Sequence, residues 1–135
     1  MKKVALTLSV LFLYACTPEI EKNTNLIKSL VEIEFFTAEP NFDEIMVSYY
    51  EYKTGTYTLN PYTFSYDLNG DPLPFKITLE NYTYKYIDGE AFRENHSSAL
   101  LTVKLYIDGA LILEDYSKGT AETFATVKFN RTIKN

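Results

Sequence analysis

The chain contains no tryptophan, one histidine and one cysteine. A single cysteine excludes a disulfide within the chain, and one histidine with one cysteine cannot supply the four ligands of a structural zinc site. Lysine and arginine total 13 against 18 aspartates and glutamates, which gives a formal net charge of −5 at pH 7. An acidic chain without a basic stripe repels phosphate groups, so no nucleic-acid partner is expected.

The chain also lacks a long apolar run. The apolar run near the N-terminus, residues 4–13, is too short to span a bilayer, and no later run is long enough to do so. Lys2 and Lys3 precede it, and Ala15 and Cys16 follow it. A positive start, a short apolar segment and a small residue before the cut site are typical of a secretory signal. The cysteine at that site resembles the signal of bacterial lipoproteins.

That resemblance implies a lipid anchor on Cys16, whose thiol would carry a diacylglyceryl group and whose freed amine would be acylated. Several acyl chains anchor a protein firmly to a bilayer, because each buried methylene contributes about 0.8 kcal/mol to membrane binding. Cleavage before Cys16 removes two lysines and leaves a more acidic chain. Thr17, directly after the cysteine, resembles proteins sorted to the outer membrane.

Tyrosine and phenylalanine are abundant, with 12 and 9 copies, and both fit half-buried strands. Apolar and polar side chains alternate in several short segments separated by turn signals, which is typical of antiparallel strands. The clearest are residues 31–35, 45–50, 75–79 and 101–107. The spacing predicts an all-β sandwich or small barrel with about seven to eight strands.

Turn residues divide these segments. Asn69-Gly70 and Asp108-Gly109 predict type I′ hairpin turns, in which both central residues need positive φ. Thr54-Gly55 predicts a turn or bulge, and Asn60-Pro61 an interruption between strands. Residues 89–98 lack a clear pattern and are expected to form a loop or a weak edge. Residues 121–129 alternate and predict a final strand.

Two rows of aromatic residues stand out as candidates for a binding surface. We expect Tyr62, Phe64, Tyr66 and Leu68 on one face of one strand, and Tyr82, Tyr84 and Tyr86 on one face of another. A row that faces solvent would stack on sugars or contact a protein. A row that faces inward would belong to the core. The lack of tryptophan favours this second interpretation, because the core of a β protein then needs other large side chains. Carbohydrate platforms often use tryptophan, so its absence counts against a sugar site.

Asp67, Asn69 and Asp71 place oxygen atoms at alternating positions, as the start of a calcium loop does. Thr78 stands where such a loop needs its closing glutamate. An Asn-Gly turn explains the same residues without an ion, so no metal site and no cofactor are predicted.

His96 lies in a polar stretch with no nucleophile elbow, so it is expected to be a surface loop residue. Carboxylates occur in pairs, at Glu32/Glu34, Asp43/Glu44, Asp88/Glu90 and Glu114/Asp115. Glycoside hydrolysis needs two carboxylates at a fixed separation across a cleft, which a sequence does not specify. Acids beside turns and on exposed strand faces are the usual solvated surface, so no enzymatic activity is predicted.

From about Ile45 onward, the order of these signals resembles the extracytoplasmic domain of the MmpS family. The matching pieces are Leu-Pro-Phe at 73–75, Thr-Val-Lys-Leu-Tyr-Ile-Asp-Gly at 102–109, and Gly119 before the last strand. The resemblance implies an immunoglobulin-like antiparallel β-sandwich. Members of that family are small partners of MmpL-type transporters and are anchored by a helix, whereas Cys16 implies a lipid.

The sequence therefore predicts a signal peptide over residues 1–15, a lipidated cysteine with a polar tether over 16–28, and a β-sandwich over 29–135. We expect a lipid-anchored protein of the bacterial cell envelope, at the outer membrane, that binds or scaffolds a protein partner such as an envelope transporter. A surface glycan-binding lipoprotein that uses exposed tyrosines is the alternative. A hydrolase with paired carboxylates is the third hypothesis.

Overall fold

The computed structural model describes residues 27–37 and 44–133, which form eleven β-strands. The strands are β1 (Ser29–Thr37), β2 (Glu44–Glu51), β3 (Thr56–Tyr57), β4 (Asn60–Thr63), β5 (Phe75–Tyr82), β6 (Tyr86–Ile87), β7 (Gly89–Phe92), β8 (Leu100–Ile107), β9 (Ala110–Lys118), β10 (Thr126–Lys128) and β11 (Arg131–Thr132). No helix that could cross a membrane occurs within these ranges. The signal peptide, Cys16 and most of the tether lie outside the described residues.

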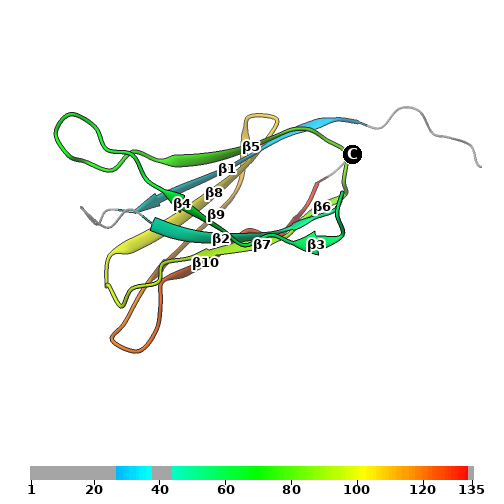
Figure 1. Cartoon of the computed structure of the whole chain (residues 1–135). Coiled ribbons are helices and arrows are strands. Elements are labelled where there is room, and N and C mark those ends of the chain that lie inside the picture. Colours follow the sequence, from blue (N-terminus) through cyan, green and yellow to red (C-terminus); the bar gives the residue numbers. More distant parts are fainter. Residues whose placement is uncertain (1–26, 38–43, 134–135) are drawn as a thin grey trace, which may run out of the picture.

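Two antiparallel sheets form the layers of a sandwich (Figure 1). One has the strand order β5-β1-β8-β9, and the other has the order β10-β7-β2, with β3 and β4 both paired to the remaining side of β2. The short strands β6 and β11 pair with each other. Strands β8 and β9, which follow β7 in the chain, lie in the first sheet, and the chain returns to the second sheet at β10. The predicted all-β sandwich is confirmed.

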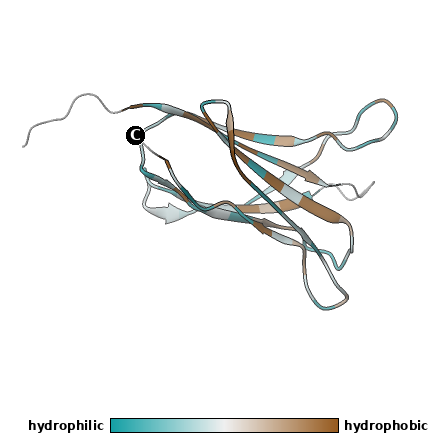
Figure 2. Ribbon diagram, turned by 180° about the vertical axis from the view of Figure 1, so that it is seen from behind, coloured by the Kyte–Doolittle hydropathy of each residue, from teal (hydrophilic) through white to brown (hydrophobic). Residues whose placement is uncertain are grey.

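The core lies between the two sheets and follows from the alternation in the sequence. In β1, Val31, Ile33 and Phe35 are fully buried, while Glu32 and Glu34 point away from the core. Figure 2 shows hydrophobic and hydrophilic stretches alternating along the strands in this way. The opposite sheet contributes Ile45, Val47, Ala91 and Val127. Burying one such large apolar side chain stabilises the fold by about 1.5–3 kcal/mol.

The hairpin β8–β9 forms as predicted. Asp108 and Gly109 have φ values of 50° and 80°, so both central residues of the turn adopt the left-handed region that a type I′ turn requires. The turn is also tied to the start of β1, because Leu30 N donates to Asp108 Oδ1 at 2.8 Å and Asp108 N donates to Leu30 O at 2.9 Å. The hairpin tip therefore lies beside the residues where the chain enters the domain.

The turn at Asn69-Gly70 forms, but its predicted type I′ geometry is wrong. Only Gly70 has a positive φ, of 84°. The carboxylate of Asp67 instead accepts the backbone N–H groups of Asn69 at 2.8 Å and of Asp71 at 2.9 Å. Side-chain capping of this kind stabilises a turn that needs only one left-handed residue.

The predicted strand carrying Tyr62, Phe64, Tyr66 and Leu68 on one face is also wrong. Strand β4 ends at Thr63, so only Tyr62 of this row belongs to it. Pro61 does not interrupt the strand but lies inside it, opposite Met46 of β2. Proline is accepted there because β4 is an edge strand and its outer side needs no N–H donor. Leu68 lies in the following loop and is fully exposed.

Residues 89–98, expected to form a loop or weak edge, begin with an interior strand instead. Strand β7 pairs with β2 on one side and with β10 on the other. Its inward positions are the small residues Gly89 and Ala91, which do not produce a visible apolar alternation. Arg93, just beyond β7, is fully buried, and its guanidinium donates to Thr37 Oγ1 at 3.0 Å.

The final strand is shorter than predicted. Only residues 126–128 of the expected segment pair, as β10. Residues 120–123 turn instead, because the Thr120 hydroxyl accepts the N–H groups of Glu122 and Thr123. A hydroxyl that binds nearby backbone N–H groups competes with ladder pairing.

The sandwich has two distinct ends (Figure 1). At one, called the terminal end here, β1 begins and the last strand β11 lies, and Ser29 pairs with Tyr82 at the end of β5. The other, the opposite end, carries the loops formed by residues 64–74, 94–99 and 119–125. The polar and aromatic residues described next gather at the terminal end.

Candidate functional site

Five tyrosine rings form a continuous chain of contacts at the terminal end. Tyr50 at the end of β2 contacts the ring of Tyr57 at 5.2 Å and the ring of Tyr52 at 4.7 Å. Tyr52 stacks on Tyr84 at 5.0 Å, and Tyr84 meets Tyr82 edge-on at 5.4 Å. These five residues and Tyr86, whose backbone oxygen accepts the Tyr82 hydroxyl at 2.6 Å, are called the tyrosine cluster.

Two turns position these rings. After β2, Gly55 adopts φ 71° and its N–H donates to Glu51 O at 2.8 Å, which returns the chain to β3 and Tyr57. At the end of β5, Asn81 adopts φ 54° and diverts the chain from the strand direction. Because β2 and β5 belong to different sheets, the stack of Tyr52 on Tyr84 bridges the two layers of the sandwich.

The predicted row Tyr82, Tyr84 and Tyr86 is therefore not one face of a single strand. Tyr82 ends β5, Tyr84 lies in the connection and Tyr86 belongs to β6. The left-handed backbone at Asn81 breaks the alternation that the prediction assumed. The three residues nevertheless lie close together. Tyr82 packs against the core, whereas Tyr84 and Tyr86 are 36% and 45% exposed.

Three adjoining depressions surround the cluster. The largest, of about 610 Å³, is lined by Tyr52, Tyr86, Ile87, Asp88, Asn130, Arg131 and Thr132. A second of about 370 Å³ shares Asp88 and Asn130 with it and reaches Tyr57. A third of about 310 Å³ shares Tyr52 and lies against Tyr82 and Tyr84. Aromatic walls with a few polar groups, at volumes of roughly 300–1,000 Å³, are typical of ligand sites.

Hydrogen bonding and burial raise the pKa of three phenols of the cluster. The hydroxyl of Tyr57 donates to the Asp88 carboxylate, and this bond raises the pKa of Tyr57 above its usual value. Burial raises the pKa of Tyr52, with the negative charge of Asp88 adding to it. Burial likewise raises the pKa of Tyr82. At neutral pH these phenols therefore serve as hydrogen-bond donors beside a carboxylate acceptor.

These shifts predict that alkali destabilises the fold. An unfolded tyrosine ionises near its usual pKa of about 10, while Tyr82 and Tyr52 in the folded state retain their protons to higher pH. The folded state then binds more protons, so the free energy of unfolding falls as pH rises above about 10. Urea unfolding at stepped pH measures this slope.

Tyr82→Phe should make the fall with pH shallower, because it removes a group whose pKa differs between the two states. Tyr116→Phe, at a 70% exposed position on β9, is the matched control and should leave the slope as it is. Two results would contradict the raised pKa of Tyr82 in the folded state. One is a free energy of unfolding that stays level from pH 9 to 12, and the other is an equal effect of both variants on the slope.

Tyr62 and Tyr66, the other predicted surface residues, lie away from the tyrosine cluster. The Tyr62 ring packs on Phe75 at 4.6 Å and joins the edge of the core. Tyr66 lies in the loop after β4, where its backbone bridges Pro72. Phe64, between them, is 3% exposed. These residues support the sandwich at its opposite end.

Asp67, Asn69 and Asp71 form a turn. Backbone N–H groups from Asp71 and Asn69 hold the pKa of Asp67 below its usual range. Its carboxylate oxygen Oδ1 is thereby committed to the backbone. Across the two stretches of chain with known placement, no group of three or more histidine, cysteine, aspartate or glutamate side chains is arranged to hold a metal ion.

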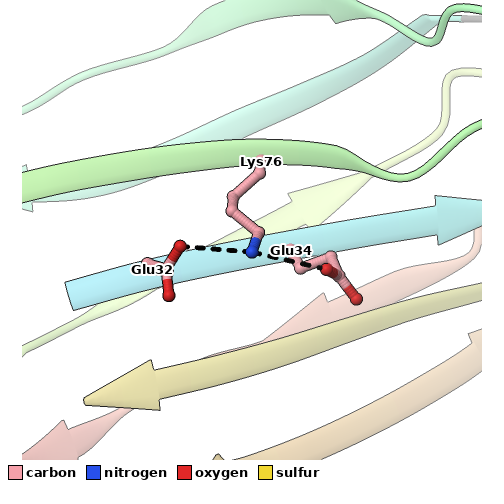
Figure 3. A network of polar contacts seen from close by, with 3 residues as sticks. All are labelled: Glu32, Glu34 and Lys76. Atoms are coloured by element: carbon pink, nitrogen blue, oxygen red, sulfur yellow. Dashed lines mark hydrogen bonds and ion pairs between the residues drawn. The ribbon is translucent and has the colours of Figure 1, made fainter. Parts of the chain in front are cut away.

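Three of the predicted paired carboxylates lie against lysines. On the outer face of β1, Glu32 and Glu34 lie 3.1 and 3.8 Å from the ammonium of Lys76 on β5 (Figure 3). The Glu32 hydrogen bond raises the pKa of Lys76. Glu114 lies 3.8 Å from Lys104 across the β8–β9 ladder.

Asp115 and Asp88, from two of the pairs, accept hydrogen bonds within the fold. Asp115 accepts the N–H of Lys128 at 2.9 Å, and Asp88 accepts the Tyr57 hydroxyl. Asp43 lies outside the described residues. His96, in a loop of the opposite end, has Nδ1 3.3 Å from Thr120 O and its ring 4.9 Å from that of Phe124.

The prediction from the sequence omits Tyr50, Tyr52 and Tyr57, as well as Asn130 and Arg131. One signal was present for the first two. Three tyrosines at positions 49, 50 and 52 cannot all face one core, because neighbouring strand residues point to opposite faces. The sequence gives no such signal for Tyr57, Asn130 and Arg131, because their places in the site depend on where β3 and β11 lie in the fold.

Comparison with known proteins returns no relative: no protein-family model, no curated protein and no solved structure matches the chain.

Proposed function

We propose that this chain is a lipid-anchored extracytoplasmic protein of the bacterial cell envelope that binds or scaffolds a protein partner through the tyrosine cluster. The observation that carries the proposal is the bridge of rings across the two sheets, with Tyr57, Tyr84 and Tyr86 open to solvent. Tyrosine gives a large contact area at low entropic cost and is enriched where partners bind tightly.

The surroundings of the cluster suit a protein contact. Asp88, Asn130 and Arg131 provide an acceptor, an amide and a cation within one depression. Aromatic centres with a polar rim are the usual anatomy of protein interfaces. Lipid attachment at Cys16 would hold this surface at a membrane, which supports an accessory partner of an envelope transporter. The order of strand and turn signals after Ile45, which resembles the MmpS family, agrees with that role.

Glycan binding is the second candidate, supported by the depression of about 310 Å³. Its walls are the rings of Tyr52, Tyr82 and Tyr84, and Glu80 and Asn81 add polar groups. Ring stacking combined with hydrogen bonds from carboxylate and amide groups is what a sugar requires. No enzymatic role is proposed, because Glu32, Glu34 and Glu114 lie against lysines and Asp115 accepts a backbone N–H.

Site-specific photocrosslinking in cells tests the proposal. A photoreactive amino acid replaces Tyr86 in the cluster, and a control replaces Tyr116 on β9, which is more solvent-accessible than Tyr86, at 70% against 45%, but lies outside the cluster. We expect one envelope membrane protein to crosslink from position 86 and not from position 116. The crosslink should disappear in the Cys16→Ser chain, and intact mass spectrometry should show the lipid on the unsubstituted chain.

The outcomes separate the candidates. Crosslinks that are equal from both positions, or that persist without the anchor, would contradict a specific partner at the membrane. If neither position captures a protein, while the folded Tyr84→Ala chain loses glycan binding that the original chain has, the glycan candidate replaces the first. A chain that carries no lipid would refute the anchor.

A further inference from the structure

We propose that the terminal end of the sandwich faces the bilayer that holds Cys16, with Tyr84 and Tyr86 at the level of the lipid headgroups. The occupant proposed for the rim formed by these two rings is the lipid interface, and the protein partner proposed above would meet the rest of the tyrosine cluster at the membrane surface. The inference rests on the proposed function, because it takes the lipid on Cys16 as given, and it adds the orientation of the domain.

The length of the tether supports this orientation. Cys16 precedes Ser29, the first residue of β1, by thirteen positions. Thirteen residues span at most about 45 Å even when fully extended. Strand β1 runs away from this point for 9 residues, or about 30 Å. The tether joins the domain at Ser29, so the chain connects the terminal end to the anchor before any other part of the sandwich.

The surface chemistry of the terminal end fits a lipid interface. Its exposed apolar and aromatic side chains include Ile27, Leu30, Tyr84, Tyr86 and, just after the β8–β9 turn, Leu111. The loops of the opposite end also expose Leu68, Leu73 and Phe124, but none of their tyrosines is exposed, so exposed tyrosine is what distinguishes the terminal end. The hydrogen bonds between Leu30 and Asp108 hold the hairpin tip beside the chain entry. Tyrosine is enriched at membrane–water interfaces, because its ring is apolar and its hydroxyl reaches water or headgroups.

The two ends of the sandwich differ in the charged residues they carry. The Lys85 ammonium lies 5.4 Å from the centre of the Tyr86 ring, and Arg131 lines the same depression as Asp88, so two cations lie at the terminal end beside one carboxylate. The loops of the opposite end, residues 64–74, 94–99 and 119–125, carry Asp67, Asp71, Glu94 and Glu122 and no lysine or arginine. Anionic lipids repel such loops and attract Lys85 and Arg131. The orientation therefore also restricts the proposed partner to one that reaches the membrane surface.

The lack of tryptophan makes the test direct, since each introduced tryptophan is the only one in the chain. Tyr86→Trp reports on the terminal end, and Leu68→Trp, at the fully exposed loop after β4, reports on the opposite end. Ala110→Trp at the exposed hairpin tip gives a second terminal-end probe outside the tyrosine cluster. Each lipidated full-length chain is reconstituted into phosphatidylcholine vesicles with or without bromine on the acyl chains.

We expect bromine to quench Tyr86→Trp and Ala110→Trp several-fold more than Leu68→Trp, with a blue shift of emission only for the first two. Equal quenching of the three chains, or stronger quenching of Leu68→Trp, would overturn the orientation while leaving the anchor intact. Intact mass spectrometry of the same samples checks the anchor separately. A missing lipid would refute the proposed function and, with it, this inference.

Discussion

Phe35→Ala is expected to lower the free energy of unfolding by about 3–5 kcal/mol. Phe35 is fully buried in β1, the central strand that pairs with both β5 and β8. Its ring stacks on Phe75 at 6.3 Å and meets Phe129 edge-on at 5.9 Å, so it joins both sheets. Alanine would lose the transfer energy of the ring and leave a cavity that closely packed neighbours cannot fill.

Urea unfolding followed by circular dichroism measures this loss, since the chain has no tryptophan to report by fluorescence. Tyr116→Ala removes a comparable ring from an exposed position and should change stability by no more than about 0.5 kcal/mol. A Phe35→Ala protein as stable as the Tyr116→Ala protein would show that the two sheets do not share the core described here.

Gly89→Ala should destabilise the fold strongly, although it adds only a single methyl group. A Cβ atom at Gly89 would lie 2.3 Å from Cζ of Phe129 and 2.6 Å from the backbone oxygen of Ser48. The ring of Phe129 is fully buried and has no space to yield. Ser48 pairs with Glu90 in the β2–β7 ladder, so its oxygen cannot move without breaking the sheet. We expect a loss of about 3 kcal/mol, at the upper end of the usual range for overpacking.

Gly70→Ala is the matched control for this second prediction. Gly70 has φ 84°, but a Cβ atom there would have no neighbour within 4 Å, so only backbone strain opposes alanine. That strain costs about 1–2 kcal/mol. The same urea titration compares both variants, and a Gly89→Ala chain that unfolds no earlier than the Gly70→Ala chain would refute the close contact with Phe129 and Ser48.

Local patterns were sufficient for some elements. The alternation of Val31, Ile33 and Phe35 with glutamates predicts β1 and its buried face, and the structure confirms both. Asp108-Gly109 predicts the hairpin β8–β9, because positive φ at two successive positions is a property of these residues themselves. In both cases the information lies within a few neighbouring residues.

Strand β7 shows why other elements escaped prediction. Its inward residues are Gly89 and Ala91, and small inward residues give no hydrophobic signal. At Gly89 the ring of Phe129 and the backbone of Ser48 in β2 leave no room for a side chain. The prediction of strand β4 failed because its sequence also carries a misleading local signal. Pro61 suggests a break, and only the position of β4 at the edge of the sheet makes proline acceptable.

The sequence by itself determined the all-β class, the turn at Asp108-Gly109, and the motif around Cys16 that predicts a lipid anchor. The tyrosine cluster was decided by tertiary structure alone. Tyr52 and Tyr84 lie 32 positions apart and follow strands of different sheets, so their stacking depends on how the two layers meet at the terminal end. Strand periodicity tells which face a side chain takes, but the layers are positioned by the packing of the whole core.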